Sequence, residues 1–288
     1  MRLPGLLRNC MRNSFNILVT KSVFGFFLVL LLSFAACKSV VPVPDDKFLT
    51  RSVTVGGQTY GYRVYLPPDR VVDQKTPVML YLHGSNRRGE DNRSQVEDLA
   101  DSIKWYPENF PFIIVFPQCR PDTFWAGPMT DQAIAALYQT VKEFNGDERR
   151  LYLAGYSMGG FGTWQTALTY PNRFAALVPV AGGIEPVGTI SDEDRKLLSQ
   201  QVITAAAAPD PYHAYAQALA KTPIWVVHGA DDEAVPVDGA RKIVAALKAA
   251  GDKDVNYTEI EGVGHGSVAI AFADNKLAEW LKKQELPE

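Results

Sequence analysis

The sequence predicts an α/β fold in which helices cover both faces of a mostly parallel sheet that follows an antiparallel hairpin. Apolar runs that end in turn residues recur along the chain, and stretches of helical periodicity separate them. Strands buried on both faces of a parallel sheet have this continuous apolar character, and their alternation with helices favours an α/β architecture. The 288 residues are 47% hydrophobic and 21% charged, which suits a globular domain with a sizeable core.

The individual elements follow from these patterns in chain order. Two strand-like runs split by Gly56 and Gly57 predict the hairpin. Five apolar runs predict the buried strands, at residues 78–84, 112–118, 150–157, 174–183 and 223–231. Helices are expected at residues 130–144, 159–170, 239–251 and 275–284. Because open α/β sheets bind ligands at the carboxyl ends of their strands, we expect the chemistry directly after the apolar runs.

The amino-terminal segment has the pattern of an export signal. Basic residues precede an apolar run at residues 23–36, which is shorter than the roughly 20 residues that span a bilayer as a helix. Cys37 follows two alanines directly, and this stretch resembles the lipobox of bacterial lipoproteins, in which the cysteine is acylated. An uncleaved membrane anchor and a plain secretory signal are the alternatives, and Met11 is an alternative start to Met1.

These features predict a signal at residues 1–36, a proline-containing tether at 37–47 and one domain at 48–288. The mature protein is expected outside the cytoplasm, anchored to the membrane by a lipid on Cys37. Cys119 is the other thiol of the mature chain and is expected to be semi-buried and structural. With a net charge of −3 and no basic block, the chain is not expected to bind nucleic acid.

A candidate nucleophile lies where the run at 150–157 passes into a helical stretch. Residues 155–159 form the pattern G-x-S-x-G, with Ser157 between a predicted strand and a predicted helix. The flanking glycines permit a turn sharp enough to project the Ser157 hydroxyl over the sheet, and the helix N-terminus supplies free N–H groups. A serine with only a structural role in a tight turn is the alternative.

A candidate acid and a candidate base follow later strands. Asp231 and Asp232 come after the strand that ends in histidine and glycine, and the residues alone leave open which carboxylate orients a histidine. A solvated acidic loop is the alternative. His265 lies in a glycine-rich loop before the last helix and completes the Ser–Asp–His chain order of α/β-hydrolases. The other three histidines are expected to order turns or to lie on a helix surface: His83, His228 and His213.

An acyl-transfer site also needs donors for the oxyanion. The expected donors are the backbone N–H groups of Ser85, directly after the run at 78–84, and of Met158, directly after the nucleophile. Loss of one such donor typically costs about 3 kcal/mol of transition-state stabilisation.

Together these motifs resemble those of a known family. The chain resembles the α/β-hydrolase esterases known as predicted peptidases, which are related to phospholipase/carboxylesterase and feruloyl-esterase-like enzymes. The resemblance covers nearly all of residues 52–281 and rests on YLHGSNRRGEDN, FPQC, LYLAGYSMGGFGTW, YPNRFAALVPVAGG, VVHGADDEAVP and GVGHGS. It implies the α/β-hydrolase fold, and it selects Asp232 as the acid, because Asp232 lies four residues after the histidine of the family pattern H-G-x-x-D-x-x-V-P.

Two departures from the family concern the substrate. Asn86 and Arg87 stand where the family usually has Gly-Glu, and Arg87 is a candidate for binding a substrate carboxylate such as a uronic acid. Residues 184–212 look longer than the family's usual link and are a possible cap beside the active site, with a surface excursion as the alternative. Ser191 is expected to cap a helix through residues 192–201 of this segment. Trp125 and Tyr156 are candidate substrate contacts, with a place in the core as the alternative.

The sequence therefore predicts a serine carboxylesterase with the triad Ser157, Asp232 and His265, acting through an acyl-enzyme. The expected substrates are small-molecule or glycan esters, such as acyl or feruloyl groups on a glycan, and no metal or organic cofactor is implied. A peptidase of the same fold and a non-catalytic surface lipoprotein that binds ligands are the alternatives. The sequence leaves open the oligomeric state and the side of the membrane.

Overall fold

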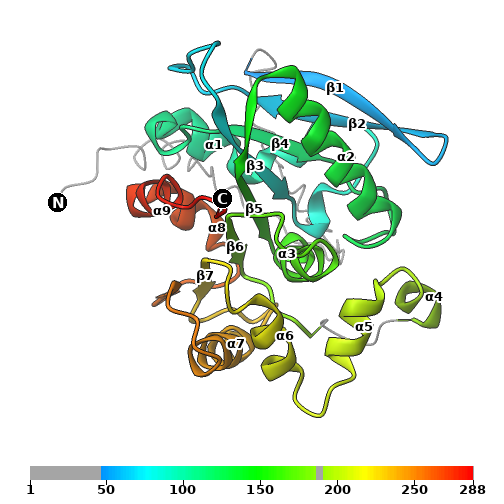
Figure 1. Cartoon of the computed structure of the whole chain (residues 1–288), viewed down its shortest axis with the longest axis vertical. Helices are drawn as coiled ribbons and strands as arrows, with labels where there is room; N and C mark the ends of the chain where they lie inside the picture. The colour runs from blue at the N-terminus through cyan, green and yellow to red at the C-terminus, as the bar shows by residue number, and fades with distance from the viewer. Residues whose placement is uncertain (1–46, 186–190, 288) are drawn as a thin grey trace, which may run out of the picture. The chain divides into compact units, whose positions relative to one another are not determined.

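The computed structural model describes residues 47–185 and 191–287. Its centre is an eight-stranded sheet of order β1-β2-β4-β3-β5-β6-β7-β8 (Figure 1). The strands β1 (Phe48–Val55), β2 (Gln58–Tyr65) and β4 (Ile113–Pro117) pair antiparallel in this order, and all other neighbours are parallel. The predicted α/β fold, with its N-terminal hairpin and mostly parallel sheet, is confirmed.

The hairpin turns through the two glycines that the sequence singles out. Val55 pairs with Gln58, so the turn contains only Gly56 and Gly57, whose φ angles are 58° and 77°. A two-residue turn with positive φ at both positions matches the twist of the paired strands, and glycine adopts it without a steric penalty.

The central strands alternate between two hydrophobic cores, one on each face of the sheet. In β3 (Thr76–Leu82), Val78 and Leu80 belong to one core, while Met79 and Tyr81 belong to the other. This explains the continuous apolar runs, because every side chain of such a strand is buried. The other parallel strands are β5 (Gly146–Tyr156), β6 (Ala176–Val180), β7 (Ile224–Gly229) and β8 (Val255–Ile260).

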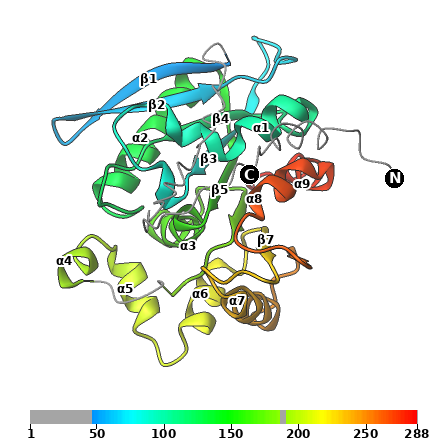
Figure 2. The same ribbon diagram turned by 180° about the vertical axis from the view of Figure 1, so that it is seen from behind.

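Two sets of helices cover the two faces (Figures 1 and 2). One face is covered by α2 (Pro128–Glu143), α3 (Met158–Thr169), α6 (Pro211–Leu219) and α7 (Asp238–Ala249). The opposite face is covered by α1 (Glu97–Trp105), α8 (Val268–Ala273) and α9 (Asn275–Leu281). Within the two described ranges, every helix is too short or too polar to span a bilayer.

Short elements complete the fold. Three 3-10 helices cover Ser85–Arg87 (η1), Ser94–Val96 (η2) and Pro107–Asn109 (η3). The segment between β6 and β7 holds α4 (Asp192–Arg195) and α5 (Gln200–Ala206). The predicted signal, Cys37 and most of the predicted tether lie outside the described residues.

The helix expected after Ser191 forms but is shorter than predicted. The Ser191 hydroxyl accepts a hydrogen bond from the Asp194 N–H at 3.0 Å, which caps α4. The chain then leaves the helix, and Ser199 caps the separate helix α5 by accepting from Val202 N–H. The extent predicted for this helix is therefore wrong, because the second capping serine starts a new helix.

Candidate active site

Ser157 lies in a strained turn between β5 and α3. Its φ and ψ are 55° and −117°, a conformation that costs a non-glycine residue of order 1–3 kcal/mol. The turn is held by a hydrogen bond from Ser157 N–H to the Val180 carbonyl at 2.9 Å. A Cβ on Gly159 would lie 1.8 Å from the Leu82 carbonyl oxygen, so only glycine permits α3 to start this close to β3.

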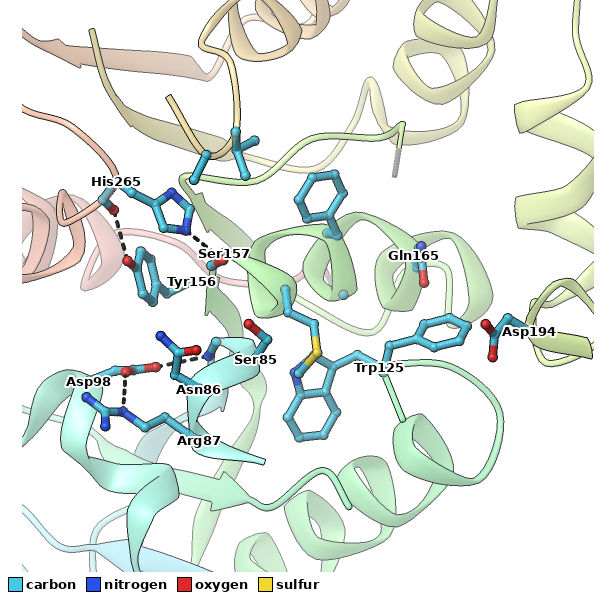
Figure 3. Close-up of a pocket in the computed structure, with 17 residues that line it drawn as sticks. Ser85, Asn86, Arg87, Asp98, Trp125, Tyr156, Ser157, Gln165, Asp194 and His265 are labelled. Carbon is cyan, nitrogen blue, oxygen red and sulfur yellow. Dashed lines mark hydrogen bonds and ion pairs between the residues drawn. The ribbon is translucent and has the colours of Figure 1, made fainter. Parts of the chain in front are cut away.

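The three residues predicted as a triad lie in one hydrogen-bonded chain. Figure 3 shows the part of this chain that joins His265 to Ser157. His265 Nε2 is 2.8 Å from Ser157 Oγ, and His265 Nδ1 is 2.8 Å from Asp232 Oδ2. A carboxylate beside Nδ1 keeps the proton on that nitrogen, so Nε2 is free to accept from the Ser157 hydroxyl. Ser157 follows β5, Asp232 follows β7 and His265 follows β8, so the carboxyl edge of the sheet brings them together.

Asp232 is buried, and hydrogen bonds to both of its carboxylate oxygens fix its position. Its Oδ1 accepts from Ala234 N–H at 3.0 Å and from Val235 N–H at 2.9 Å, and its side chain is fully buried. His228 Nε2 lies 3.2 Å from Oδ2 and 2.9 Å from the Val235 carbonyl oxygen. Asp231, in contrast, is exposed, so the geometry distinguishes the two adjacent carboxylates.

The two predicted oxyanion donors belong to residues that line the same pocket as Ser157. Ser85 is the first residue of η1 and Met158 is the first residue of α3, and both line the pocket that contains Ser157 and His265. The first N–H groups of a helix have no partner within the helix, so both groups are available to a ligand. A developing oxyanion is stabilised by such preorganised donors.

The loop that presents Ser85 is anchored by a residue that the sequence reasoning missed. Asp98, in the first turn of α1, accepts from Gly84 N–H through Oδ2 at 3.0 Å and from Arg87 Nε through Oδ1 at 3.0 Å. Its side chain is only 5% exposed. The sequence signal for this region is the adjacent acidic pair Glu97 and Asp98. Acidic side chains are typical of the first turn of a helix, so the pair indicates where a helix starts, but not the contact with Gly84.

His83 anchors the same loop from the other side. Its Nε2 accepts from Cys119 N–H at 2.9 Å, so Nδ1 is the protonated nitrogen and donates to the Gly84 carbonyl at 2.7 Å. Burial lowers the pKa of His83 to about 4, and the ring therefore stays neutral at pH 7. The predicted turn-ordering role of His83 agrees with these contacts. Cys119 is fully buried rather than semi-buried, and burial raises the pKa of its thiol to about 11.

Trp125 and Tyr156, the two predicted aromatic contacts, both line the pocket and both support the site from behind. Trp125 is 1% exposed and donates from Nε1 to the His83 carbonyl at 3.0 Å. The Tyr156 hydroxyl donates to the His265 carbonyl at 2.9 Å, and burial, with smaller contributions from Asp98 and Asp232, raises its pKa to about 12. Each aromatic therefore fixes a loop that presents a site residue, in addition to forming part of the wall.

The pocket has a volume of about 620 Å³ and reaches well beyond Ser157. Arg87 lines it, but its guanidinium points to two protein carboxylates, Glu97 and Asp98. At the end opposite His265 lie Gln165 and Asp194 (Figure 3). Asp194 belongs to α4, so the predicted cap segment contributes to the pocket wall.

No grouping of three or more His, Cys, Asp or Glu side chains in the described part of the chain is arranged to hold a metal ion. His213, expected on a helix surface, is exposed on α6.

The arrangement of Ser157, His265 and two backbone donors supplies what nucleophilic acyl transfer requires.

An eight-stranded, mostly parallel sheet with a serine in a tight strand–helix turn defines the chain as an α/β-hydrolase. The model of the prolyl oligopeptidase family matches residues 125–285, more than half of the chain. The protein belongs to this family. Ser157, Asp232 and His265 all lie within the matched segment, whereas Ser85 and Asp98 precede it.

Two relatives show what the chain resembles. It is 27% identical over 241 residues to an uncharacterised secreted protein of Arthroderma benhamiae, with 76% of this chain and 25% of the relative covered. It is 31% identical over 132 residues to a bifunctional acetylxylan esterase/xylanase of Neocallimastix patriciarum, with 41% and 17% covered. The chain thus spans a quarter or less of the length of these relatives.

Solved structures agree with the fold. A thermostable esterase superposes with a TM-score of 0.66 at 29% identity, covering 83% of this chain and 63% of the other. A ferulic acid esterase superposes with a TM-score of 0.61 at 19% identity, covering 82% and 98%. The expected resemblance to α/β-hydrolase esterases, feruloyl esterases among them, is confirmed.

Proposed function

We propose that the protein is an exported serine carboxylesterase that removes acyl groups, acetyl or feruloyl, from glycans. The observation that supports this best is the chain of two 2.8 Å hydrogen bonds from Asp232 through His265 to Ser157, in which His265 and Ser157 line a pocket of about 620 Å³. A similar bifunctional acetylxylan esterase/xylanase and a similar secreted protein support the substrate class and export.

The proposed reaction runs through an acyl-enzyme. His265 Nε2 takes the proton of the Ser157 hydroxyl as Oγ attacks the ester carbonyl, and the N–H groups of Ser85 and Met158 stabilise the oxyanion. Asp232 stabilises the imidazolium that forms. His265 then protonates the departing alcohol, and a water molecule, activated by His265, releases the acid from Ser157.

A fluorophosphonate probe followed by a substrate panel tests this function. We expect the probe to label Ser157 in the wild-type protein and not in Ser157→Ala, and we expect release of acetate from 4-nitrophenyl acetate. A protein that neither reacts with the probe nor hydrolyses any aryl ester is instead the non-catalytic binding protein that the sequence left as an alternative.

A peptidase is the second candidate, and the family itself favours it, since the matching model is that of the prolyl oligopeptidases. The two candidates share the nucleophile and differ in the leaving group. Peptides and acylated peptides in the same panel separate them, because kcat/KM for amides above that for matched esters would identify a peptidase.

We further propose that Cys37 is acylated and anchors the protein to a membrane. The lipobox-like sequence before Cys37 supports this, and the residue lies outside the part that the structure describes. Mass spectrometry of membrane-derived protein is expected to find lipid on Cys37, and Cys37→Ser is expected to release the protein or to block its processing. An unmodified Cys37 in the membrane fraction would contradict the anchor.

A further inference from the structure

The pocket wall includes an aromatic ring and two polar side chains that the reaction does not use. Gln165 and Asp194 lie at the end distant from His265 (Figure 3). Phe124 lines the same pocket, and all three residues are half-buried. They come from three different segments: the loop before α2, the outer part of α3, and α4. A second cavity of about 200 Å³ adjoins it and shares Gln165 and Trp125 with the main pocket.

The polar groups at this end are open to a ligand. Among the residues that the structure describes, neither the Asp194 carboxylate nor the Gln165 side-chain amide has a hydrogen-bond or ion-pair partner. Asp192 and Glu193, the other acidic residues of α4, are exposed and do not line the pocket. Among the three acidic residues of α4, Asp194 is therefore the one whose side chain is available to a ligand in the pocket.

The charge of the pocket wall is negative at this end. Arg87 is the cation of the wall, and its Nε and Nη1 bind Asp98 and Glu97. The Asp194 carboxylate has no such compensation within the described ranges. A negative, partly desolvated wall repels an anionic ligand and accepts hydrogen bonds from hydroxyl groups.

We propose that Phe124, Gln165 and Asp194 form a subsite for a neutral sugar ring in the alcohol part of the ester, and that Asp194 discriminates against uronic acids. The inference rests on the proposed esterase function and specifies its substrate. The half-buried ring of Phe124 offers a flat apolar surface to the C–H face of a sugar. Asp194 accepts hydrogen bonds from hydroxyls, and the Gln165 amide both donates and accepts.

Three acetyl esters that differ only in the alcohol test the subsite: 4-nitrophenyl acetate, an acetylated methyl xyloside, and an acetylated methyl galacturonide. We expect kcat/KM for the xyloside to exceed that for the galacturonide by about tenfold or more. This factor corresponds to one hydrogen bond to a charged group together with the repulsion between two carboxylates. Asp194→Asn should reduce this ratio to about threefold or less, because the amide no longer repels a carboxylate. Glu193→Gln, its exposed neighbour on α4, serves as the matched control and should keep the wild-type ratio.

A second variant tests the ring. Phe124→Ala should raise KM for the xyloside, and Phe124→Tyr should restore it because the flat surface is kept. Equal or better use of the galacturonide by the wild-type protein would overturn the subsite and favour Arg87 as the group that reads the sugar. An unchanged ratio in Asp194→Asn, or the same change in Glu193→Gln, would also overturn it. Failure of the wild-type protein to hydrolyse 4-nitrophenyl acetate would instead remove the esterase function on which the inference rests.

Discussion

At the scale of single residues, the site distinguishes two chemically identical carboxylates by their position. Asp231 and Asp232 are adjacent, yet Asp231 is exposed, whereas Asp232 is buried, with three hydrogen-bond donors to its two oxygens and His228 Nε2 at 3.2 Å from one of them. Its sequence position alone gives no reason to prefer it, and the family pattern was needed to select it. The contacts provide the physical reason: only Asp232 reaches His265.

Asp232→Asn should therefore reduce kcat for ester hydrolysis by about 10⁴-fold, because an amide cannot hold the Nδ1–H tautomer of His265 or stabilise the imidazolium. Asp231→Asn is the control and should stay within about twofold of the wild type. Steady-state kinetics with 4-nitrophenyl acetate measures both. A greater loss in Asp231→Asn would mean that the acid is misassigned.

Asp98 gives a second prediction at this scale. Asp98→Ala removes the acceptor for Gly84 N–H and the partner of Arg87 Nε, so the loop that presents the Ser85 donor loses an anchor. We expect kcat to fall by about tenfold with little change in KM, because the oxyanion donor acts in the transition state. Asp98→Asn, which keeps an acceptor for Gly84 N–H, should recover part of kcat. A rise in KM with kcat unchanged in both variants would place Asp98 in substrate binding instead.

At the scale of elements, the strand–turn–helix unit of β5 and α3 depends on backbone contact between α3 and β3. Gly159 approaches the Leu82 carbonyl so closely that no Cβ fits between them. Since Leu82 directly precedes His83 and Gly84, the start of α3 and the oxyanion loop share one packing contact. A change there displaces the nucleophile and the oxyanion donors together.

Gly159→Ala should lower the free energy of unfolding by about 3 kcal/mol or more and abolish esterase activity, because the methyl group forces α3 away from β3. Gly239→Ala, within α7, is the matched control. Its new Cβ meets only the Tyr212 hydroxyl at 3.7 Å, so stability should be unchanged or rise by up to about 1 kcal/mol. Urea denaturation of both variants gives the comparison, and equal stabilities would disprove the packing argument.

The same scale shows what could be predicted from the sequence. Strands buried on both faces were predictable, because each reads as an unbroken apolar run. β8 was not, since Val255–Ile260 mixes polar and apolar residues and every one of them is only half-buried at the sheet edge. The proximity of Ser157 and His265 followed from the rule that strand ends meet. The places of Asp98 and Asp194 in the pocket depend on how α1 and α4 pack, which no local pattern encodes.

At the scale of the whole molecule, burial of a neutral histidine links stability to pH. Burial lowers the pKa of His83 to about 4, whereas an unfolded histidine titrates near 6.5. Between these values the unfolded chain binds a proton that the native protein does not. Stability from this source is therefore complete above about pH 6.5 and is lost as the pH falls towards 4.

We expect His83 to contribute a loss of up to about 3 kcal/mol in the free energy of unfolding over this interval. Urea titrations at several pH values between 7.5 and 4.5 measure the slope. His83→Gln should be less stable at pH 7 but should show a shallower slope, whereas His213→Gln, which alters an exposed histidine, should keep the wild-type slope. Identical slopes in all three proteins would show that His83 is not the titrating group.

The candidate catalytic residues and Asp194 lie on different kinds of segment, and this difference has an evolutionary consequence. Ser157, Asp232 and His265 follow strands whose places are fixed by the sheet, while Asp194 is borne by a surface connection that also holds α5. Insertions and deletions are tolerated in surface connections far better than in a sheet. Related proteins can therefore differ at the end of the pocket that contains Asp194, and so in the alcohol group that the proposed subsite selects, while they keep the same three residues Ser157, Asp232 and His265.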